Sequence, residues 1–329
     1  MRLRLVVPAN VDEPTGGNAY DLALADALRR GGDEVELRRC APSELETVLR
    51  QPWEGPTLVD GLLASPQPDA IAAARVGVLV HMPLALETGL PRDRAAELDR
   101  RERRTLHAAV CVITTSHWTA RHLREHYDVG EVAVAAPGVD AAPLGAGSDP
   151  PLLVQLASLV PHKDQLTVVA ALAGVADLPW HARLAGPTDR DPAYAAAVRD
   201  AVHAAGLENR VDIPGTMPRD AAWAGADLAL LPSLVESFGM VVTEALARGV
   251  PAVVSAGGPE EALGVTATGE RPGIVVPAGD ADALGRALRR WLTDERCRDS
   301  IRRAALARRV TLEPWDVTAR RVREALARG

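Results

Sequence analysis

The stretch of this chain best equipped for chemistry is PSLVESFGMVVTEALARGVP, residues 232–251. Seven residues separate its two glutamates, Glu236 and Glu244, and the pair brackets a predicted loop-to-helix junction. Gly239 stands at that junction, so backbone N–H groups at the helix start are free to face an anion, reinforced by the helix dipole. We therefore expect the chemistry here, with a phosphate group as the first candidate ligand.

The elements that must position these glutamates follow from the flanking residues. An apolar run at 228–231 predicts a buried strand that Pro232 ends, and residues 240–248 predict a helix with Gly249 at its C′ position. The apolar residues 250–255 then predict the next strand.

Length and composition narrow the class of protein. The chain has 329 residues, of which 47% are hydrophobic, so we expect two domains that each bury a core. Its formal net charge is -7 and no long basic run occurs, which argues against nucleic-acid binding.

Cysteine use and hydropathy favour a soluble, cytoplasmic protein. Cys40, Cys111 and Cys297 are too far apart to indicate a disulfide framework or a zinc site. The apolar run at residues 3–7 is too short for a signal peptide, and no stretch approaches the ~18 apolar residues of a membrane span.

Lysine is almost absent from the chain, because Lys163 is the single lysine among 37 basic residues. Arginine's planar fork is not equivalent to a compact ammonium, so a lone lysine indicates that the ammonium itself is needed. Chance is the alternative explanation.

Short apolar runs alternate with helical patterns twice, which predicts two parallel sheets covered by helices. The segment 141–150 is rich in small residues, Pro and Gly, and predicts an interdomain linker. Two such Rossmann-like, doubly wound domains would face each other across a cleft at the carboxyl ends of their strands. The expected strands are 3–7, 34–37, 57–59, 76–81, 110–114 and 132–135, then 152–157, 182–185, 211–213, 228–231, 252–255 and 274–276.

We therefore expect an acceptor-side domain at 1–140, a donor-binding domain at 151–311 and a terminal helix at 312–329 that packs back on the first domain. The terminal segment supports this helix with apolar residues at helical spacing after Pro314.

The chain resembles nucleotide-sugar-dependent glycosyltransferases of the GT-B fold, in particular the retaining family 4. The resemblance lies in a Glu-x7-Glu signature and in four shorter phrases spread along the chain. These are residues 227–251, GGPEEAL at 257–263, GIVVPAGD at 273–280, PGVD at 137–140 and TSHW at 115–118.

The resemblance implies roles for both glutamates and the residues between them. Glu244 would accept hydrogen bonds from the ribose hydroxyls of the donor, and Glu236 would contact hydroxyls of the transferred sugar. Backbone amides from Ser237 through Phe238 and Gly239 to Met240 would hold the donor's sugar or phosphate.

The resemblance also implies a diphosphate site. Gly16 and Gly17, placed before a helix expected at 18–30, would let the backbone approach the diphosphate. Lys163 would neutralise charge on the leaving diphosphate. The family usually has an arginine where this chain has Ser158, so either another arginine completes the clamp or the diphosphate is held more weakly.

Three further regions have two interpretations each. His81 ends an expected strand and aligns with a family histidine near the donor sugar, but could equally be a structural donor. The helix that Ser116 opens could line the acceptor side, or be a capped helix with a packed Trp118. The loop around Met217 is the expected site of base recognition, although nothing in it separates uracil from guanine.

Two other signals are better explained by structure. Asp189 and Asp191 imitate a metal-binding Asp-x-Asp, but Pro192 follows, so Asp191 is expected to be an N-cap. Asp280 has the same interpretation, and we expect no metal site. The arginine-rich residues 92–104 are interleaved with acids, which favours a solvated helix face over a membrane-binding surface.

The function expected is that of a metal-independent, retaining hexosyltransferase that moves a sugar from a nucleoside diphosphate to a small-molecule or glycan hydroxyl. It would use the nucleotide sugar as co-substrate and need no other cofactor. The alternatives are a sugar-nucleotide epimerase or hydrolase on the same fold, and a catalytically weak donor-binding partner subunit, which Ser158 favours. The base, sugar, acceptor and oligomeric state are not readable from the sequence.

Overall fold

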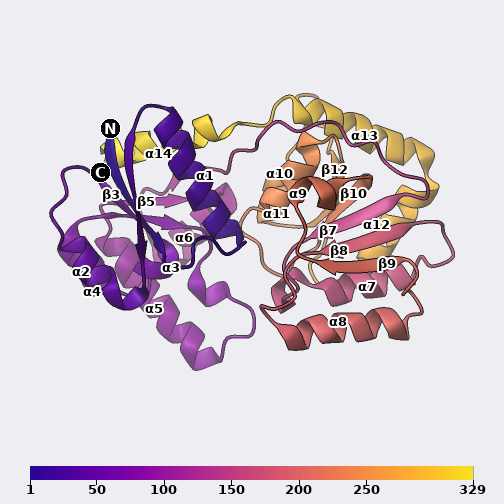
Figure 1. Cartoon of the computed structure of the whole chain (residues 1–329), viewed down its shortest axis with the longest axis horizontal. Coiled ribbons are helices and arrows are strands. Elements are labelled where there is room, and N and C mark those ends of the chain that lie inside the picture. Colours follow the sequence, from indigo (N-terminus) through magenta and orange to yellow (C-terminus); the bar gives the residue numbers. More distant parts are fainter. Residues whose placement is uncertain (329) are drawn as a thin grey trace. The chain divides into compact units, whose positions relative to one another are not determined.

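The computed structural model describes residues 1–328, which divide into two compact units (Figure 1). The first comprises Met1–Gly138 and the C-terminal segment from Glu313, and the second comprises Val139–Leu312. Each unit has its own cluster of fully buried apolar side chains.

The first unit is built on a six-stranded sheet in which every neighbouring pair is parallel. In spatial order the strands are β2 (Glu34–Cys40), β1 (Arg2–Pro8), β3 (Thr57–Asp60), β4 (Gly77–Val80), β5 (Cys111–Thr114) and β6 (Ala133–Val134). The helices are α1 (Gly16–Arg30), α2 (Leu45–Leu49), α3 (Gly61–Ala64), α4 (Pro68–Ala74), α5 (Arg92–Ala108), α6 (His117–Tyr127) and α14 (Trp315–Arg328).

The second unit repeats this architecture with another six-stranded parallel sheet. Its spatial order is β12 (Gly273–Val276), β11 (Ala252–Ser255), β10 (Ala226–Leu231), β7 (Leu152–Leu156), β8 (His181–Ala185) and β9 (Val211–Gly215). The helices are α7 (Gln165–Ala173), α8 (Pro192–Ala204), α9 (Arg219–Trp223), α10 (Met240–Ala247), α11 (Gly258–Leu263), α12 (Ala281–Thr293) and α13 (Glu295–Arg309).

All twelve expected strands are present, with boundaries that differ by two or three residues at most. They form because apolar runs such as β10, every residue of which is buried, are covered on both faces in a parallel sheet. The expectation of two Rossmann-like doubly wound domains is thus confirmed.

The terminal helix α14 packs against α1 of the first unit, as expected (Figure 1). The ring of Trp315 meets the ring of Tyr20 edge-on, with centroids 5.3 Å apart. Thr318 Oγ1 donates a hydrogen bond to Ala136 O at 2.7 Å. Arg323 Nε donates to Asp33 Oδ2 at 2.5 Å. The last helix therefore belongs to the core of the unit that contains the first strand.

Side-chain caps explain where several helices start. Asp191 caps α8 with Pro192 at the first turn and accepts the Tyr194 N–H at 2.9 Å, which confirms its expected role. Asp280 caps α12 in the same way, accepting the Ala283 N–H at 2.7 Å.

The segment 141–150 differs from the expected free linker, because it is part of the second unit. Gly145 N–H donates to Arg248 O at 2.9 Å, and the backbone N–H groups of Ser148 and Leu152 both donate to the carboxylate of Asp227. A buried carboxylate therefore ties down a stretch whose composition alone is typical of a flexible connection, and the chain changes unit at 138–139 and again at 312–313.

Among the described residues, no helix has both the length and the apolar character required to cross a membrane. On α5, Arg100 and Arg101 pair with Glu97, and Arg104 pairs with Asp69. These ion pairs fit the expected solvated face.

Candidate functional site

Loops that follow three neighbouring strands of the second unit converge at one edge of the sheet. Parallel pairing places the carboxyl ends of β7, β10 and β11 side by side. Leu234 N–H donates to His162 O at 2.9 Å, which ties the β10 loop to the β7 loop. A Cβ added to Gly258 would lie 2.2 Å from Ser237 O, so only glycine lets the start of α11 approach the β10 loop.

This convergence brings together the lone lysine and the first glutamate. Lys163 Nζ donates to Glu236 Oε2 at 2.5 Å, and their side chains are 20% and 15% exposed. Gln155, on β7, supports the lysine loop by donating from Nε2 to Lys163 O at 2.7 Å. A cation and a carboxylate thus lie together, each partly exposed, in the loops at the carboxyl end of the sheet.

The helix start after Glu236 has the expected geometry. Gly239 is the N-cap of α10 with φ +89°, and no side chain caps the helix. The first backbone N–H groups of α10 therefore lack the side-chain acceptor that Asp191 and Asp280 supply to α8 and α12. Phe238, 7% exposed, anchors the loop, and Gly249, with φ +71°, ends the helix as expected.

Glu244 lies on α10, is 7% exposed and forms an ion pair with Arg219 through Oε1. Its second oxygen, Oε2, is buried and has no hydrogen-bond partner among residues 1–328. Burial raises the pKa of this carboxyl, although the Arg219 charge opposes that shift. A buried acceptor of this kind is expensive to leave without a donor, so the position suits a ligand hydroxyl.

The predicted base loop is adjacent to Glu244 through the same ion pair. Met217 is half-buried in the turn between β9 and α9, two residues before Arg219. The structure thus brings Met217 to the neighbourhood of Glu244, which sequence separation alone does not indicate.

The Ser158 region contains another arginine. Ser158 offers its backbone oxygen to Gln165 Nε2 at 3.0 Å, so the loop is fixed even without the arginine of the family. Burial, Lys163 and Arg190 lower the pKa of the neighbouring His162 to about 4. His162 is therefore neutral near pH 7, and Lys163 and the exposed Arg190 supply the positive charge.

The remaining candidates lie in the first unit. Gly16 and Gly17 are the first two residues of α1, not of a loop, because Thr15 caps the helix by accepting the Asn18 N–H at 3.1 Å. Gly16 has open space where a Cβ would stand, whereas a Cβ on Gly17 would lie 3.1 Å from Cδ2 of His81.

His81 follows β4 and faces two buried carboxylates. Its Nε2 lies 3.0 Å from Asp21 Oδ1 and 3.3 Å from Asp60 Oδ2. The histidine therefore has the structural partners that its second interpretation requires, while 18% of its side chain stays exposed.

The helix α6 opens as expected, with Ser116 Oγ accepting the Thr119 N–H at 3.0 Å. Trp118 is half-buried and stacks on His122 with centroids 6.1 Å apart. This geometry agrees with a capped helix and leaves the acceptor-side interpretation a prediction.

Sequence reasoning missed Arg219, Arg190, Asp21 and Asp60. The one available signal was a polar residue within an apolar pattern, since Asp60 ends the buried strand β3 and Asp21 is 0% exposed on α1. Nothing in the sequence connects either of them to His81.

Two Rossmann-like units, each built on a six-stranded parallel sheet, define the fold class as GT-B. The family model described as "Glycosyl transferases group 1" matches residues 139–308, more than half of the 329-residue chain. The protein belongs to this family, which confirms the resemblance drawn from the Glu-x7-Glu signature.

Among curated proteins, a D-inositol 3-phosphate glycosyltransferase of Kineococcus radiotolerans is 30% identical over 257 residues, or 69% of this chain and 59% of the relative. The chain thus spans less than two thirds of that relative's length. Sucrose-phosphate synthase from Thermosynechococcus elongatus has the same fold, with TM-score 0.82, 19% identity and 98% of both chains covered. Anabaena Alr3699/HepE in complex with UDP-glucose aligns with TM-score 0.72, 19% identity and 99% of both chains covered.

Proposed function

We propose that this protein is a retaining, metal-independent glycosyltransferase that moves a sugar from a nucleoside diphosphate to a hydroxyl acceptor. The observation that carries the proposal is the arrangement in the second unit. Lys163, Glu236 and the uncapped start of α10 lie at the carboxyl edge of one sheet, and the buried free oxygen of Glu244 lies on the same helix.

The donor nucleotide is assigned to Glu244 and the loop around Met217. A ribose offers two neighbouring hydroxyl donors, and Glu244 Oε2 is a buried acceptor without a partner in the described part of the chain. Because HepE is similar in fold and was crystallised with UDP-glucose, a uridine donor is the first to test.

The diphosphate is assigned to Lys163, the backbone amides from Ser237 to Met240, and Arg190. These groups place positive charge where negative charge develops on the departing phosphate. We assign Arg190 to this site because it is exposed and its charge, like that of Lys163, acts on His162.

The chemistry is a same-face displacement at the anomeric carbon. The bond from that carbon to the departing phosphate oxygen breaks, the acceptor oxygen bonds to the same face, and the phosphate oxygen takes the acceptor's proton. No protein nucleophile is needed, so catalysis comes from positioning and from electrostatic stabilisation. Glu236 would orient the transferred sugar through its hydroxyls.

The acceptor is proposed only by class, as a small molecule or glycan with a free hydroxyl. Inositol 3-phosphate is the first compound to test because a relative is named for it. The cytoplasm is the compartment we propose.

A thermal-shift screen against UDP, GDP, ADP and TDP, each with and without magnesium, tests the donor site. We expect one nucleotide to raise the melting temperature without magnesium, and Glu244→Ala to abolish the rise. Turnover is then followed as nucleoside diphosphate release, and the anomeric coupling constant of the product distinguishes retention from inversion. An inverted product or a strict magnesium requirement would refute the mechanism.

A second candidate is a donor-binding subunit with little turnover, which the serine at position 158 favours. It predicts a nucleotide-induced thermal shift without sugar transfer to any acceptor. An epimerase or hydrolase on this fold would instead change the nucleotide sugar when no acceptor is added.

A further inference from the structure

Three titratable side chains meet in the first unit, outside the site described in the second. Asp21 comes from α1, Asp60 from the end of β3, and His81 from the end of β4. Both carboxylates lie within 3.3 Å of His81 Nε2, and Asp21 and Asp60 are 0% and 3% exposed. His81 is the most exposed member of this cluster, with 18% of its side chain accessible to solvent.

The backbone and neighbouring rings hold this cluster in one geometry. Asp60 Oδ1 accepts the Leu62 N–H at 2.6 Å, which fixes the carboxylate as the cap of α3. Gly17 packs against the imidazole so closely that a Cβ would lie 3.1 Å from Cδ2. Tyr20 meets the ring edge-on, with centroids 5.1 Å apart. His81 therefore has little freedom to rotate.

The charges around the ring decide its protonation. Burial by itself would lower the pKa of His81, but the opposing effect of Asp21 and Asp60 is larger, and the pKa is raised. Asp60 has a lowered pKa despite burial because His81 and the Leu62 N–H bond to it, whereas burial raises the pKa of Asp21. Burial and the charge of Asp21 raise the pKa of Tyr20, so this side chain stays neutral, and the charge of Arg321 opposes that shift.

A buried arrangement of this kind is a poor way to gain stability. The cost of removing charges from water often exceeds their mutual attraction, and an apolar replacement can be as stable. One histidine held by two carboxylates therefore calls for a reason beyond folding. With Nε2 turned toward both carboxylates, the protonated ring has one N–H left, at Nδ1, and it can only donate.

We infer that Asp21 and Asp60 are positioning residues that fix His81 and keep it protonated, so that Nδ1–H is presented to a substrate oxygen as a permanent donor. The inference rests on the proposed glycosyl transfer, in which a hydroxyl or phosphate oxygen is the acceptor of that hydrogen bond.

The test is the titration of His81 itself, followed by NMR of its ring in the full-length protein, beside the pH dependence of kcat with a UDP-sugar donor. In the wild type we expect His81 to stay protonated above pH 8. Asp21→Asn should lower its midpoint by about one pH unit or more. The alkaline limb of the kcat profile should move to lower pH by the same amount as the His81 midpoint. Asp60→Asn repeats the test if Asp21→Asn fails to fold.

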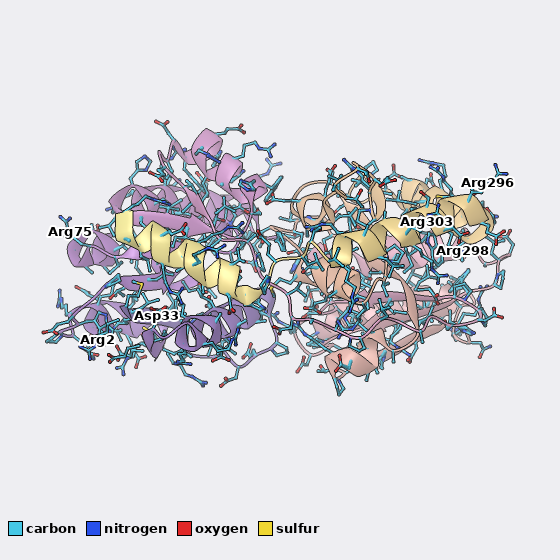
Figure 2. All side chains as sticks on the ribbon, turned by 90° about the horizontal axis from the view of Figure 1, so that it is seen from above. Arg2, Asp33, Arg75, Arg296, Arg298 and Arg303 are labelled. Carbon is cyan, nitrogen blue, oxygen red and sulfur yellow. The ribbon has the colours of Figure 1, made fainter. Side chains whose placement is uncertain are left out.

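The matched control is Asp33→Asn, which removes another buried carboxylate of the same unit (Figure 2). Asp33 pairs with the N-terminal amine and Arg323, at the opposite end of α1 from Gly17. It should lower thermal stability without moving either the His81 midpoint or the pH profile.

Two results would overturn the inference. The first is a wild-type His81 that titrates near its ordinary value of 6.5. The second is an Asp21→Asn variant whose His81 midpoint falls while the kcat profile stays in place, because the charge would then be irrelevant to turnover.

A bound cation is the competing explanation, since ligand-type atoms of these three side chains lie within 4.8 Å of one another. If EDTA lowers the melting temperature of the wild type but not of Asp21→Asn, the carboxylates hold a cation and the positioning role is wrong. If the wild type releases no nucleoside diphosphate, the proposed transferase fails and the catalytic use of His81 with it. The NMR midpoint still decides whether the carboxylates clamp the ring.

Discussion

The carboxylates of the two units differ in how firmly their partners are fixed. In the second unit, Glu236 pairs with a lysine that is 20% exposed and Glu244 with an arginine that is 56% exposed. In the first unit, Asp21 and Asp60 are buried and share a single histidine.

We therefore expect the carboxylates of the second unit to exchange their protein partners for a ligand, and those of the first unit to keep His81 as their partner. An ion pair contributes less to stability the more solvent reaches it, so a ligand can replace one member of the pairs in the second unit at a smaller cost. Breaking a buried pair leaves a charge without water or partner and is far more costly. The second unit is therefore suited to take up a phosphate and hydroxyls, and the first to fix the orientation of one ring.

The largest expected effect comes from Lys163→Ala, which removes the exchangeable cation. We expect kcat to fall by about 10²–10³-fold and donor affinity to fall less, because the charge is needed most when the phosphate departs. Steady-state kinetics and nucleotide titration separate the two. Arg296→Ala, on the surface of α13, is the control and should change neither (Figure 2). An unchanged kcat would show that the lysine is not catalytic.

A smaller effect is expected when Glu244 becomes neutral. Glu244→Gln should weaken nucleotide binding by roughly 10–100-fold, because hydrogen bonds from ribose to a charged acceptor are lost. Calorimetric titration with UDP measures this change. Binding equal to that of the wild type would remove Glu244 from the ribose site.

The same variant has an opposite effect on stability. Since burial raises the pKa of Glu244 above its unfolded value, the folded state binds the proton more tightly. The stability of the wild type therefore declines as the pH rises from the unfolded-state pKa of Glu244 to its folded-state pKa. The Glu244→Gln variant lacks this decline. We expect the melting temperature of the variant, relative to the wild type, to rise from pH 4 to pH 8. A constant difference across this range would contradict the raised pKa.

The sequence predicted more of the candidate site in the second unit than of the His81 cluster in the first. The strands and the α10 junction could be predicted from the sequence, because strand ends in a parallel sheet lie at one edge and short motifs mark them. The pairing of Lys163 with Glu236 was not predicted. Lys163, Met217 and Glu236 each follow a strand end by two to seven positions, whereas Glu244 lies further along, on α10.

The cluster around His81 could not be predicted from the sequence, because its members come from three elements, lie 21 to 60 residues apart, and are brought together only by packing. Likewise, Arg219 lies 25 positions before Glu244 on another helix. The start of α1 was misplaced by two residues, since two glycines argue against a helix but Thr15 supplies the cap.

Arg190→Ala should produce a modest effect, because this arginine is exposed and its proposed contact with the donor phosphate is open to solvent. We expect KM for the donor to rise by roughly 3–10-fold with kcat nearly constant. The matched control is Arg199→Ala, an exposed arginine on α8. If Arg190→Ala leaves KM unchanged, the second positive charge of the diphosphate site must come from elsewhere.

The smallest expected effect compares Gly16→Ala with Gly17→Ala, measured as melting temperature without ligand. Alanine favours a helix by up to about 1 kcal/mol over glycine, and Gly16 has open space for the methyl group, so Gly16→Ala should be neutral or stabilising. At Gly17 the methyl group would press on His81, which two buried carboxylates prevent from moving aside. Overpacking of this kind costs about 1–3 kcal/mol, so Gly17→Ala should melt at a lower temperature. Equal melting temperatures would mean that the ring yields, and that the carboxylates hold it less firmly than their distances indicate.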